Sequence, residues 1–104
     1  MNDTTIIAIS TPVAESAIGV IRISGSEALS MLKKVFRGKL STEGNTTSYG
    51  KITDPENGLV LDDVVVSVFR APHSYTAEDV VEISAHGNPF ILRDIVELFT
   101  RLGA

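Results

Sequence analysis

The stretch that decides the fold of this chain is Thr76-Ala-Glu-Asp-Val-Val-Glu-Ile-Ser-Ala-His-Gly-Asn-Pro-Phe90. Within it, residues 79–85 divide into two alternating sets of side chains with a period of two, which predicts a strand. Asn88 is a favourable N-cap residue, and Pro89 suits the first position of a helix. The stretch therefore predicts a strand, a tight corner and a helix that must pack on a sheet.

Apolar residues recur at helical spacing beyond this corner, at Ile91, Leu92, Ile95, Leu98, Phe99 and Leu102. Gly103 follows them and is typical of a helix stop. We expect free backbone amides and the positive helix end at His86-Gly87, beside the strand that carries Glu82. Such a corner can receive an anion or a polar ligand.

The length of 104 residues is enough for one domain with a real hydrophobic core. The chain has no cysteine, which excludes a disulfide framework, a thiolate metal site and a cysteine nucleophile. The first residues show no signal-peptide pattern, and no apolar run approaches the roughly 20 residues that a membrane helix needs. We therefore expect a soluble, cytoplasmic protein without a membrane partner.

The net charge is −4, with nine lysine and arginine residues. The basic cluster formed by Lys33, Lys34 and Arg37 suits the C-terminal end of a helix. This distribution is not typical of a nucleic-acid-binding surface. If a nucleic acid is the substrate, another part of the protein must hold most of it.

Four further strands are predicted, in residues 5–10, 17–24, 47–53 and 59–70. The first of these is so apolar that we expect it to be buried on both faces. A second helix is predicted to run from a capping box at Ser24 and Glu27, with Ser26 as a rival cap, to about Phe36. The order ββαβββα contains a strand–helix–strand unit and a hairpin, which predicts an α/β (α+β) fold with a mixed β-sheet and two main helices.

Three local features refine this fold. Gly19 inside a strand predicts a bulge or a close backbone approach. Residues 54–58, Asp-Pro-Glu-Asn-Gly, are typical of a hairpin turn. Asp62 and Asp63, early in the long strand that follows, are expected to lie near solvent.

Arg22 and Glu82 each interrupt an otherwise apolar strand, on a face whose neighbours are valine and serine. One interpretation is a partly buried ion pair, or two charges on edge strands. The other is the floor of a ligand pocket. A carboxylate can accept two parallel N–H bonds from an amidine-like edge, and arginine can bind a carboxylate or a carbonyl. The residues by themselves leave both interpretations open.

The acidic and histidine residues His73, Glu78, Asp79, Glu82 and His86 lack the spacing of a metal site on one element. We therefore expect no metal, and we expect His86 to be a hydrogen-bonded residue that stabilises the corner.

Hydroxyl side chains in residues 74–76 more often cap turns than line a pocket. The sequence has no G-x-x-x-x-G-K-[ST] loop and no arguable Ser–His–Asp arrangement. We therefore expect no catalytic residue in this chain and no nucleotide binding of the P-loop type.

Four motifs follow one another along the chain. They are Thr4-Thr-Ile-Ile-Ala-Ile-Ser-Thr-Pro12, Ile18-Gly-Val-Ile-Arg-Ile-Ser-Gly25, Pro72-His-Ser-Tyr-Thr-Ala-Glu-Asp-Val-Val-Glu-Ile83 and His86-Gly-Asn-Pro89. In this order they resemble the N-terminal domain of the MnmE (TrmE) family of tRNA-modification GTPases over nearly the whole chain. Residues 13–17, Ala77 and Asn88 depart from the glycine-rich pattern usual in that family.

The resemblance implies that residues 1–104 are an N-terminal tetrahydrofolate-binding and dimerisation domain, similar in fold to the folate domains of aminomethyltransferases. A helical domain and a GTPase domain, with potassium and magnesium ions, are expected in the longer protein. With the partner MnmG, a flavin and NADH enzyme, the family adds a carboxymethylaminomethyl-type group at C5 of the wobble uridine of certain tRNAs. A tetrahydrofolate derivative, in the 5-formyl or 5,10-methylene form, is the implied cofactor and supplies the one-carbon unit.

The family's folate-contacting arginine and glutamate fall on Arg22 and Glu82, and a further folate-contacting lysine is expected beyond Ala104. A pterin offers two parallel N–H donors, which a buried carboxylate matches well. The resemblance is also the main reason to expect a homodimer, and a physical reason is added by residues 59–69, which carry apolar side chains on both faces of one strand. The alternatives are a structural dimerisation module without folate binding and an independent one-carbon transferase.

Overall fold

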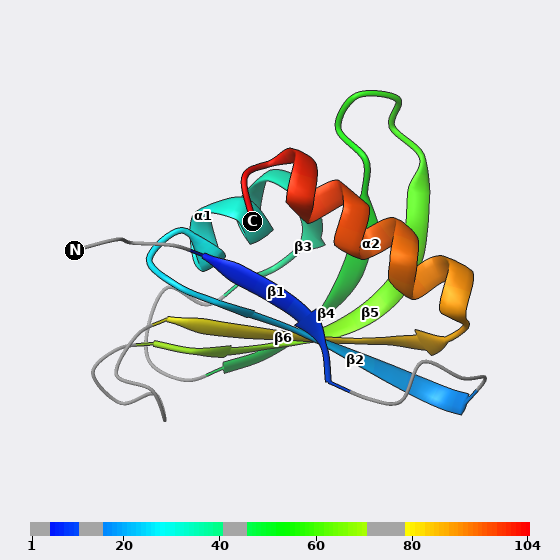
Figure 1. The fold of residues 1–104 in the computed structure, drawn as a ribbon, viewed down its shortest axis with the longest axis horizontal. Helices are drawn as coiled ribbons and strands as arrows, with labels where there is room; N and C mark the ends of the chain where they lie inside the picture. Colours follow the sequence, from blue (N-terminus) through cyan, green and yellow to red (C-terminus); the bar gives the residue numbers. More distant parts are fainter. Residues whose placement is uncertain (1–4, 11–15, 41–45, 71–78) are drawn as a thin grey trace.

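Six strands and two helices make up the described part of the chain, which is residues 5–10, 16–40, 46–70 and 79–104 of a computed structural model. The strands are β1 (Ile6–Ile9), β2 (Ser16–Ser24), β3 (Phe36–Gly38), β4 (Thr46–Thr53), β5 (Val60–Phe69) and β6 (Val80–Gly87). The helices are α1 (Ala28–Val35) and α2 (Pro89–Arg101). The strands form one sheet in the order β1-β2-β6-β5-β4-β3 (Figure 1).

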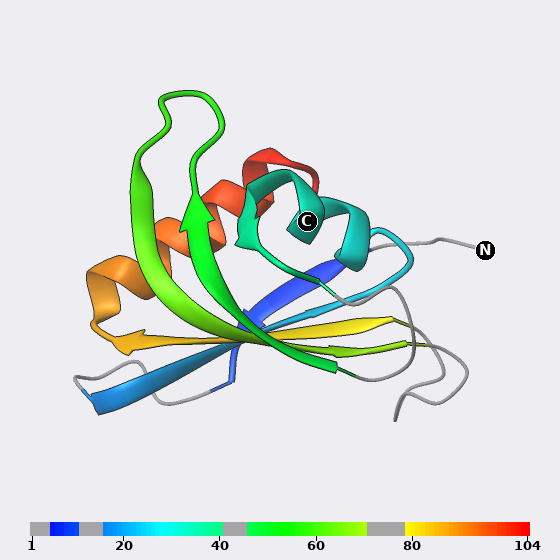
Figure 2. The same ribbon diagram turned by 180° about the vertical axis from the view of Figure 1, so that it is seen from behind.

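Both helices lie on the same side of the sheet (Figure 1, Figure 2). The core fills the space between the helices and the sheet, and its fully buried residues include Ile21, Ile23, Leu32, Val66, Val81, Ile83, Leu92, Ile95 and Phe99. Side chains alternate along each strand, so the residues between the core positions point to the other side. We call that side the open face. It carries Arg22 on β2, Glu82 and Ser84 on β6, and Val65 on β5.

The predicted strand, corner and helix are present as β6 and α2. The side chain of Asn88 accepts hydrogen bonds from the amides of Phe90 and Ile91, and Pro89 is the first helical residue. Gly103 follows the helix with a φ of 116°, a conformation that side chains disfavour. The apolar stripe of α2 packs on the sheet, as its periodicity predicts.

The α+β class with two main helices is confirmed, but the sheet is not mixed. All five strand pairings among the described residues are antiparallel. The expected strand–helix–strand unit of residues 17–53 would join β2 to β4, but these two strands run in opposite directions and are separated by β6 and β5. The helix is followed directly by β3, a short strand that sequence reasoning took for the end of the helix and the loop beyond it.

The predicted capping box at the start of α1 is wrong. Glu27 is the N-cap residue and makes no side-chain capping bond. Its backbone amide instead donates to Thr5 Oγ1 at 3.1 Å, and Thr5 is buried. Ser24 cannot cap the helix because it is still part of β2, where it pairs with Ile6 and Val80.

The prediction that residues 5–10 are buried on both faces is also wrong. β1 is an edge strand that pairs with β2, and Ile6 is 60% exposed. Ile7 and Ile9 pack partly against the core. One side of this strand therefore packs partly against the core while the other is exposed, and an apolar composition does not distinguish the two sides.

Of the two readings of Gly19, the close backbone approach is confirmed. Gly19 pairs in regular register with Ala85, and the irregularity of the bulge type in β2 lies earlier, between Ser16 and Ile18. A Cβ atom added to Gly19 would lie 2.6 Å from Leu92 Cδ1. The glycine therefore lets α2 approach the sheet closely.

The predicted hairpin joins β4 to β5 and rises on the helix side of the sheet (Figure 1, Figure 2). Asp54 closes its turn, since its side chain accepts from the amide of Glu56 at 2.9 Å. Arg101 at the end of α2 then donates to both carboxylates, at 3.0 Å to Asp54 and 3.1 Å to Glu56. This ion pair ties the hairpin to the helix. Among the described residues, neither helix is long and apolar enough to cross a membrane.

Candidate functional site

Arg22 and Glu82 face each other across two neighbouring strands on the open face. They are direct partners in the antiparallel register of β2 and β6. Arg22 Nη1 lies 3.9 Å from Glu82 Oε2, and the two side chains are 40% and 33% exposed. This distance exceeds that of a hydrogen bond, so the ion pair is loose. Both side chains therefore keep the capacity to form hydrogen bonds with a ligand.

A hollow of about 180 Å³ lies beside this pair, and Phe69 and Val80 complete its lining. We call it the Arg–Glu hollow. One aromatic ring, one aliphatic side chain and two opposite charges make up its walls. Pockets for drug-sized ligands typically exceed about 300 Å³. The Arg–Glu hollow therefore suits one ring system rather than a whole cofactor.

The groups in the Arg–Glu hollow suit a flat heterocycle with N–H donors along one edge. The Glu82 carboxylate can accept two parallel hydrogen bonds, and the Arg22 guanidinium can donate to a carbonyl or a carboxylate. Phe69 and Val80 offer apolar contact to a ring. The predicted meeting of Arg22 with Glu82 is present in the structure, and its ligand-binding role stays a prediction.

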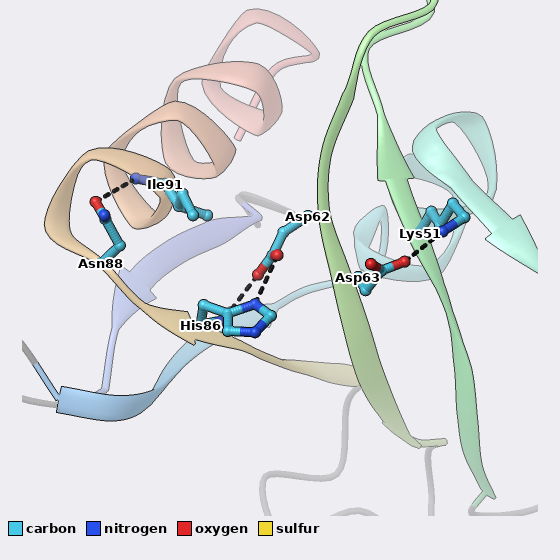
Figure 3. Close-up of polar contacts among 6 residues, drawn as sticks. All are labelled: Lys51, Asp62, Asp63, His86, Asn88 and Ile91. Carbon is cyan, nitrogen blue, oxygen red and sulfur yellow. Dashed lines mark hydrogen bonds and ion pairs between the residues drawn. The ribbon is translucent and has the colours of Figure 1, made fainter.

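His86 stabilises the corner after β6, as the sequence predicts. Its Nδ1 atom lies 2.7 Å from Asp62 Oδ1, and its backbone amide donates to Asp62 Oδ2 at 2.7 Å (Figure 3). The Asp62 side chain is only 9% exposed, so the expectation that it lies near solvent is wrong. Adjacent strand residues point to opposite faces, which indicates that Asp62 and Asp63 cannot share one environment. That signal was available in the sequence.

The expectation of free amides at this corner is wrong as well. Asp62 accepts from the amide of His86, and Asn88 accepts from that of Ile91 (Figure 3). Asn88 also accepts from the amide of Phe90. The amide of Leu92 donates to the Asn88 carbonyl in the first turn of the helix. Local hydrogen bonds therefore satisfy these four amides without a bound anion.

A second hollow, of about 380 Å³, lies where β5 separates from β6. We call it the notch, and its lining includes Ile18, Tyr49, Asp63, Val65, Ser84 and His86. At its rim Lys51 forms an ion pair with Asp63, whose hydrogen bond raises the pKa of the lysine (Figure 3). Sequence reasoning missed Ile18 and Tyr49 because single exposed apolar residues in strands carry no functional signal.

Several candidates from the sequence lie outside the described residues. Residues 71–78 include His73, Ser74, Tyr75, Thr76 and Glu78, and residues 11–15 include most of the segment that departs from the family pattern. Their roles stay predictions.

Comparison with known proteins gives the chain its family. A family model described as the GTP-binding protein TrmE N-terminus matches residues 5–104. The chain belongs to the TrmE N-terminal family. The resemblance carried by its four motifs is thereby confirmed.

Several proteins that are similar in sequence to this TrmE N-terminal chain carry the name tRNA modification GTPase MnmE. The one from Streptococcus mutans is 49% identical over 102 residues, the one from Streptococcus pyogenes 46% and the one from Streptococcus agalactiae 45%. Each alignment covers 96% of this chain but only 22% of the relative. The chain thus spans about a fifth of the length of these relatives.

Proposed function

We propose that this chain is the tetrahydrofolate-binding domain of a tRNA-modification GTPase. The observation that carries the proposal is the loose Arg22–Glu82 pair beside a hollow walled by Phe69 and Val80. Membership of the TrmE N-terminal family supports it. The resemblance to that family implies that its folate-contacting arginine and glutamate fall on the same two positions.

The residues of the Arg–Glu hollow fit the pterin of a tetrahydrofolate. Glu82 would accept the two parallel N–H donors of the pterin edge, and Arg22 would donate to its carbonyl. The wall formed by Phe69 and Val80 would contact the ring. The folate, in its 5-formyl or 5,10-methylene form, would supply a one-carbon unit, and the residues of this chain would bind and orient it.

The whole protein would act with MnmG to place a carboxymethylaminomethyl-type group at C5 of the tRNA wobble uridine. The names of the relatives support tRNA modification and GTP hydrolysis as its activities. The sequence contains no P-loop, so GTP, magnesium and potassium would bind to another part of that protein. The net charge of −4 places most of the tRNA contact elsewhere as well.

A homodimer formed by this domain is part of the proposal. Exposed apolar side chains support it, since Ile18, Tyr49 and Val65 are 60%, 69% and 39% exposed around the notch. A two-fold pairing of identical chains is the commonest way to cover such residues. Sedimentation across a concentration series tests it, and a monomer at every concentration would exclude it.

Titration calorimetry with 5-formyltetrahydrofolate tests the folate site. Glu82→Ala should weaken binding by at least 10-fold, because loss of a charged hydrogen-bonding partner costs about 1.5–3 kcal/mol. Glu97→Ala, on the exposed side of α2, is the matched control and should bind like the unaltered protein. Equal affinity of all three proteins would remove Glu82 from the site.

The second candidate is a structural dimerisation module that does not bind folate. It is favoured by residues 13–17, which depart from the family's glycine-rich segment. The same titration separates the two functions, since a module of this kind gives no heat of binding while it still sediments as a dimer.

A further inference from the structure

The two edges of the sheet differ in their protection against further strands. β3 forms one edge, where Arg37 is exposed and charged. β1 forms the other edge with the run Ile-Ile-Ala-Ile, which contains neither a charge nor a proline. Charged side chains and prolines are usual means by which natural edge strands avoid pairing with another chain. The edge at β1 therefore lacks the protection that the edge at β3 has.

The hydrogen bonding of β1 determines which backbone groups this edge offers. The amide of Ser10 donates to the Val20 carbonyl of β2 at 2.7 Å. Bonded residues alternate along an antiparallel pair, so Ala8 also bonds to β2, whereas Ile7 and Ile9 direct their N–H and C=O groups outward. No other described strand pairs with this edge. An added strand requires such donors and acceptors at alternate residues.

A hollow of about 540 Å³ lies between this edge and the N-terminal half of α2. We call it the edge groove, and it is lined by Ala8, Ile9, Pro89, Phe90, Arg93 and Val96. Adjacent residues of a strand point to opposite faces, and the inner edge of β1 is covered by β2. A hollow that both Ala8 and Ile9 line therefore reaches the outer backbone of β1. It shares no lining residue with the Arg–Glu hollow or the notch.

Arg93 supplies the charge of the edge groove. Its Cζ atom lies 5.3 Å from the centre of the Phe90 ring, and it forms no ion pair with any residue that the structure describes. The acidic side chains of α2, Asp94 and Glu97, line a different hollow beside Arg101. The edge groove is therefore apolar with one cation that has no acidic neighbour, which favours an apolar ligand with a carboxylate.

This charge also distinguishes between two occupants of the edge. If the β1 strands of two copies of this chain paired, each Arg93 would meet the run Ile-Ile-Ala-Ile, which has no carboxylate. Such a pair would leave both guanidinium groups without an opposite charge. An extended segment of another protein can place a carboxylate beside Arg93 while its main chain bonds to Ile7 and Ile9.

We propose that the edge groove receives an extended, acidic segment of a partner protein, which adds a strand to the sheet beside β1. The main chain of the segment bonds to Ile7 and Ile9, and its alternate apolar side chains pack against Phe90. One of its carboxylates pairs with Arg93. Binding of this segment needs neither folate nor the residues around the notch, so it goes beyond the proposed function.

Two short capped peptides test the charge by titration calorimetry on this chain. One alternates valine with glutamate, and the other alternates valine with lysine. The glutamate peptide should bind more tightly than the lysine peptide by roughly 3-fold or more. Arg93→Glu should reverse this order. Arg37→Glu makes the same change of charge at the other edge and should leave the order as it is.

The aromatic wall and the added strand are tested with the glutamate peptide. Phe90→Ala should weaken its binding by roughly 3- to 10-fold, the usual contribution of an aromatic contact. At saturation the peptide should slow hydrogen exchange of the Ile7 and Ile9 amides by roughly 10-fold or more and leave the amides of β3 unchanged. The same peptide with methyl groups on alternate backbone nitrogens cannot form the ladder and should protect neither amide.

Four outcomes would overturn the proposal. They are the absence of binding of the glutamate peptide, an unchanged order of the two peptides in Arg93→Glu, binding without protection of Ile7 and Ile9, and protection of these amides before peptide is added. Protection that appears only at high chain concentration would assign the edge to a second copy. Protection at every concentration would assign it to a segment of the protein itself.

Failure of this proposal and failure of the proposed function are distinguishable. Arg93→Glu and Phe90→Ala should bind 5-formyltetrahydrofolate like the unaltered chain, since neither residue lines the Arg–Glu hollow. Both residues are exposed, so both variants should fold, and a thermal melt of each checks this. The comparison of the peptides on the unaltered chain does not depend on any variant.

Discussion

The two faces of the sheet use the same strands for different purposes. On the face covered by α1 and α2, the side chains of β2, β5 and β6 are aliphatic and almost fully buried. On the open face the same strands present Arg22, Glu82, Ser84 and His86 beside two hollows. The comparison teaches that the residues of the core and those of the proposed ligand site are separated by one residue of strand register.

The largest expected effect on stability lies on the covered face. Leu92 of α2 is fully buried between the helix and the sheet. Leu92→Ala should lower the free energy of unfolding by about 2–5 kcal/mol, because it leaves a cavity. Urea denaturation measures this loss, and Phe90→Ala on the exposed side of the same helix should change stability by less than about 0.5 kcal/mol. Similar losses in both variants would contradict the division between the faces.

A smaller loss of stability is expected where Leu92 of α2 packs against Gly19 of β2. A Cβ atom at Gly19 would meet Leu92 Cδ1 at 2.6 Å, so Gly19→Ala should destabilise by about 1–3 kcal/mol. In the Leu92→Ala background the clashing methyl groups are absent and the same change should cost much less. Additive losses in the double variant would show that the contact does not limit the approach of α2.

The Arg101 ion pair, which ties the β4–β5 hairpin to α2, should respond to acid. The hydrogen bond from the Glu56 amide and then the one from Arg101 lower the pKa of Asp54 below its ordinary 3.8. A lowered folded-state pKa stabilises the fold above pH 3.8, and this contribution is lost as the pH falls through the folded value. Arg101→Ala should reduce the acid-dependent part of the unfolding free energy.

Arg93→Ala on the same helix is the control for that change. Urea denaturation at neutral pH and at several values below pH 4 gives the comparison. Identical pH profiles of Arg101→Ala and the unaltered protein would remove the ion pair as the cause.

The smallest effect on stability is expected on the open face. Glu82 and Arg22 are partly exposed and 3.9 Å apart, and such pairs contribute about 0–1 kcal/mol. Glu82→Ala should therefore leave the melting temperature nearly unchanged while it weakens the binding of folate. A large loss of melting temperature would favour the ion-pair interpretation over the pocket floor.

Sequence reasoning was most accurate where local chemistry decides the structure. The strand before Asn88, its capping of the helix, Pro89 and the hairpin at residues 54–58 were all predicted. These features depend on residues a few positions apart, so their signal lies in one short window. The sequence singled out Arg22 and Glu82 because each interrupts an apolar strand, and an ion pair between them was one of the interpretations that it left open.

The errors have a common physical cause. The start of α1 depends on a hydrogen bond from the Glu27 amide to Thr5. Thr5 is far from the helix in the sequence, so no short window of residues indicates this contact. The exposure of Ile6 depends on β1 being at the edge of the sheet. The burial of Asp62 depends on His86 of another strand. Each error concerns a contact between elements, and the alternation that separates Asp62 from Asp63 does not say which of the two such a contact buries.

The sequence by itself determined the family, the α+β class, the β6–α2 corner and the two residues of the Arg–Glu hollow. The tertiary structure alone decided the antiparallel order, which places β6 between β2 and β5. That placement sets Arg22 opposite Glu82, and it opens the notch where β5 leaves β6. Local propensity determines where a strand forms. Packing of the whole core determines which strands lie next to one another, and a surface made by adjacent strands depends on that order.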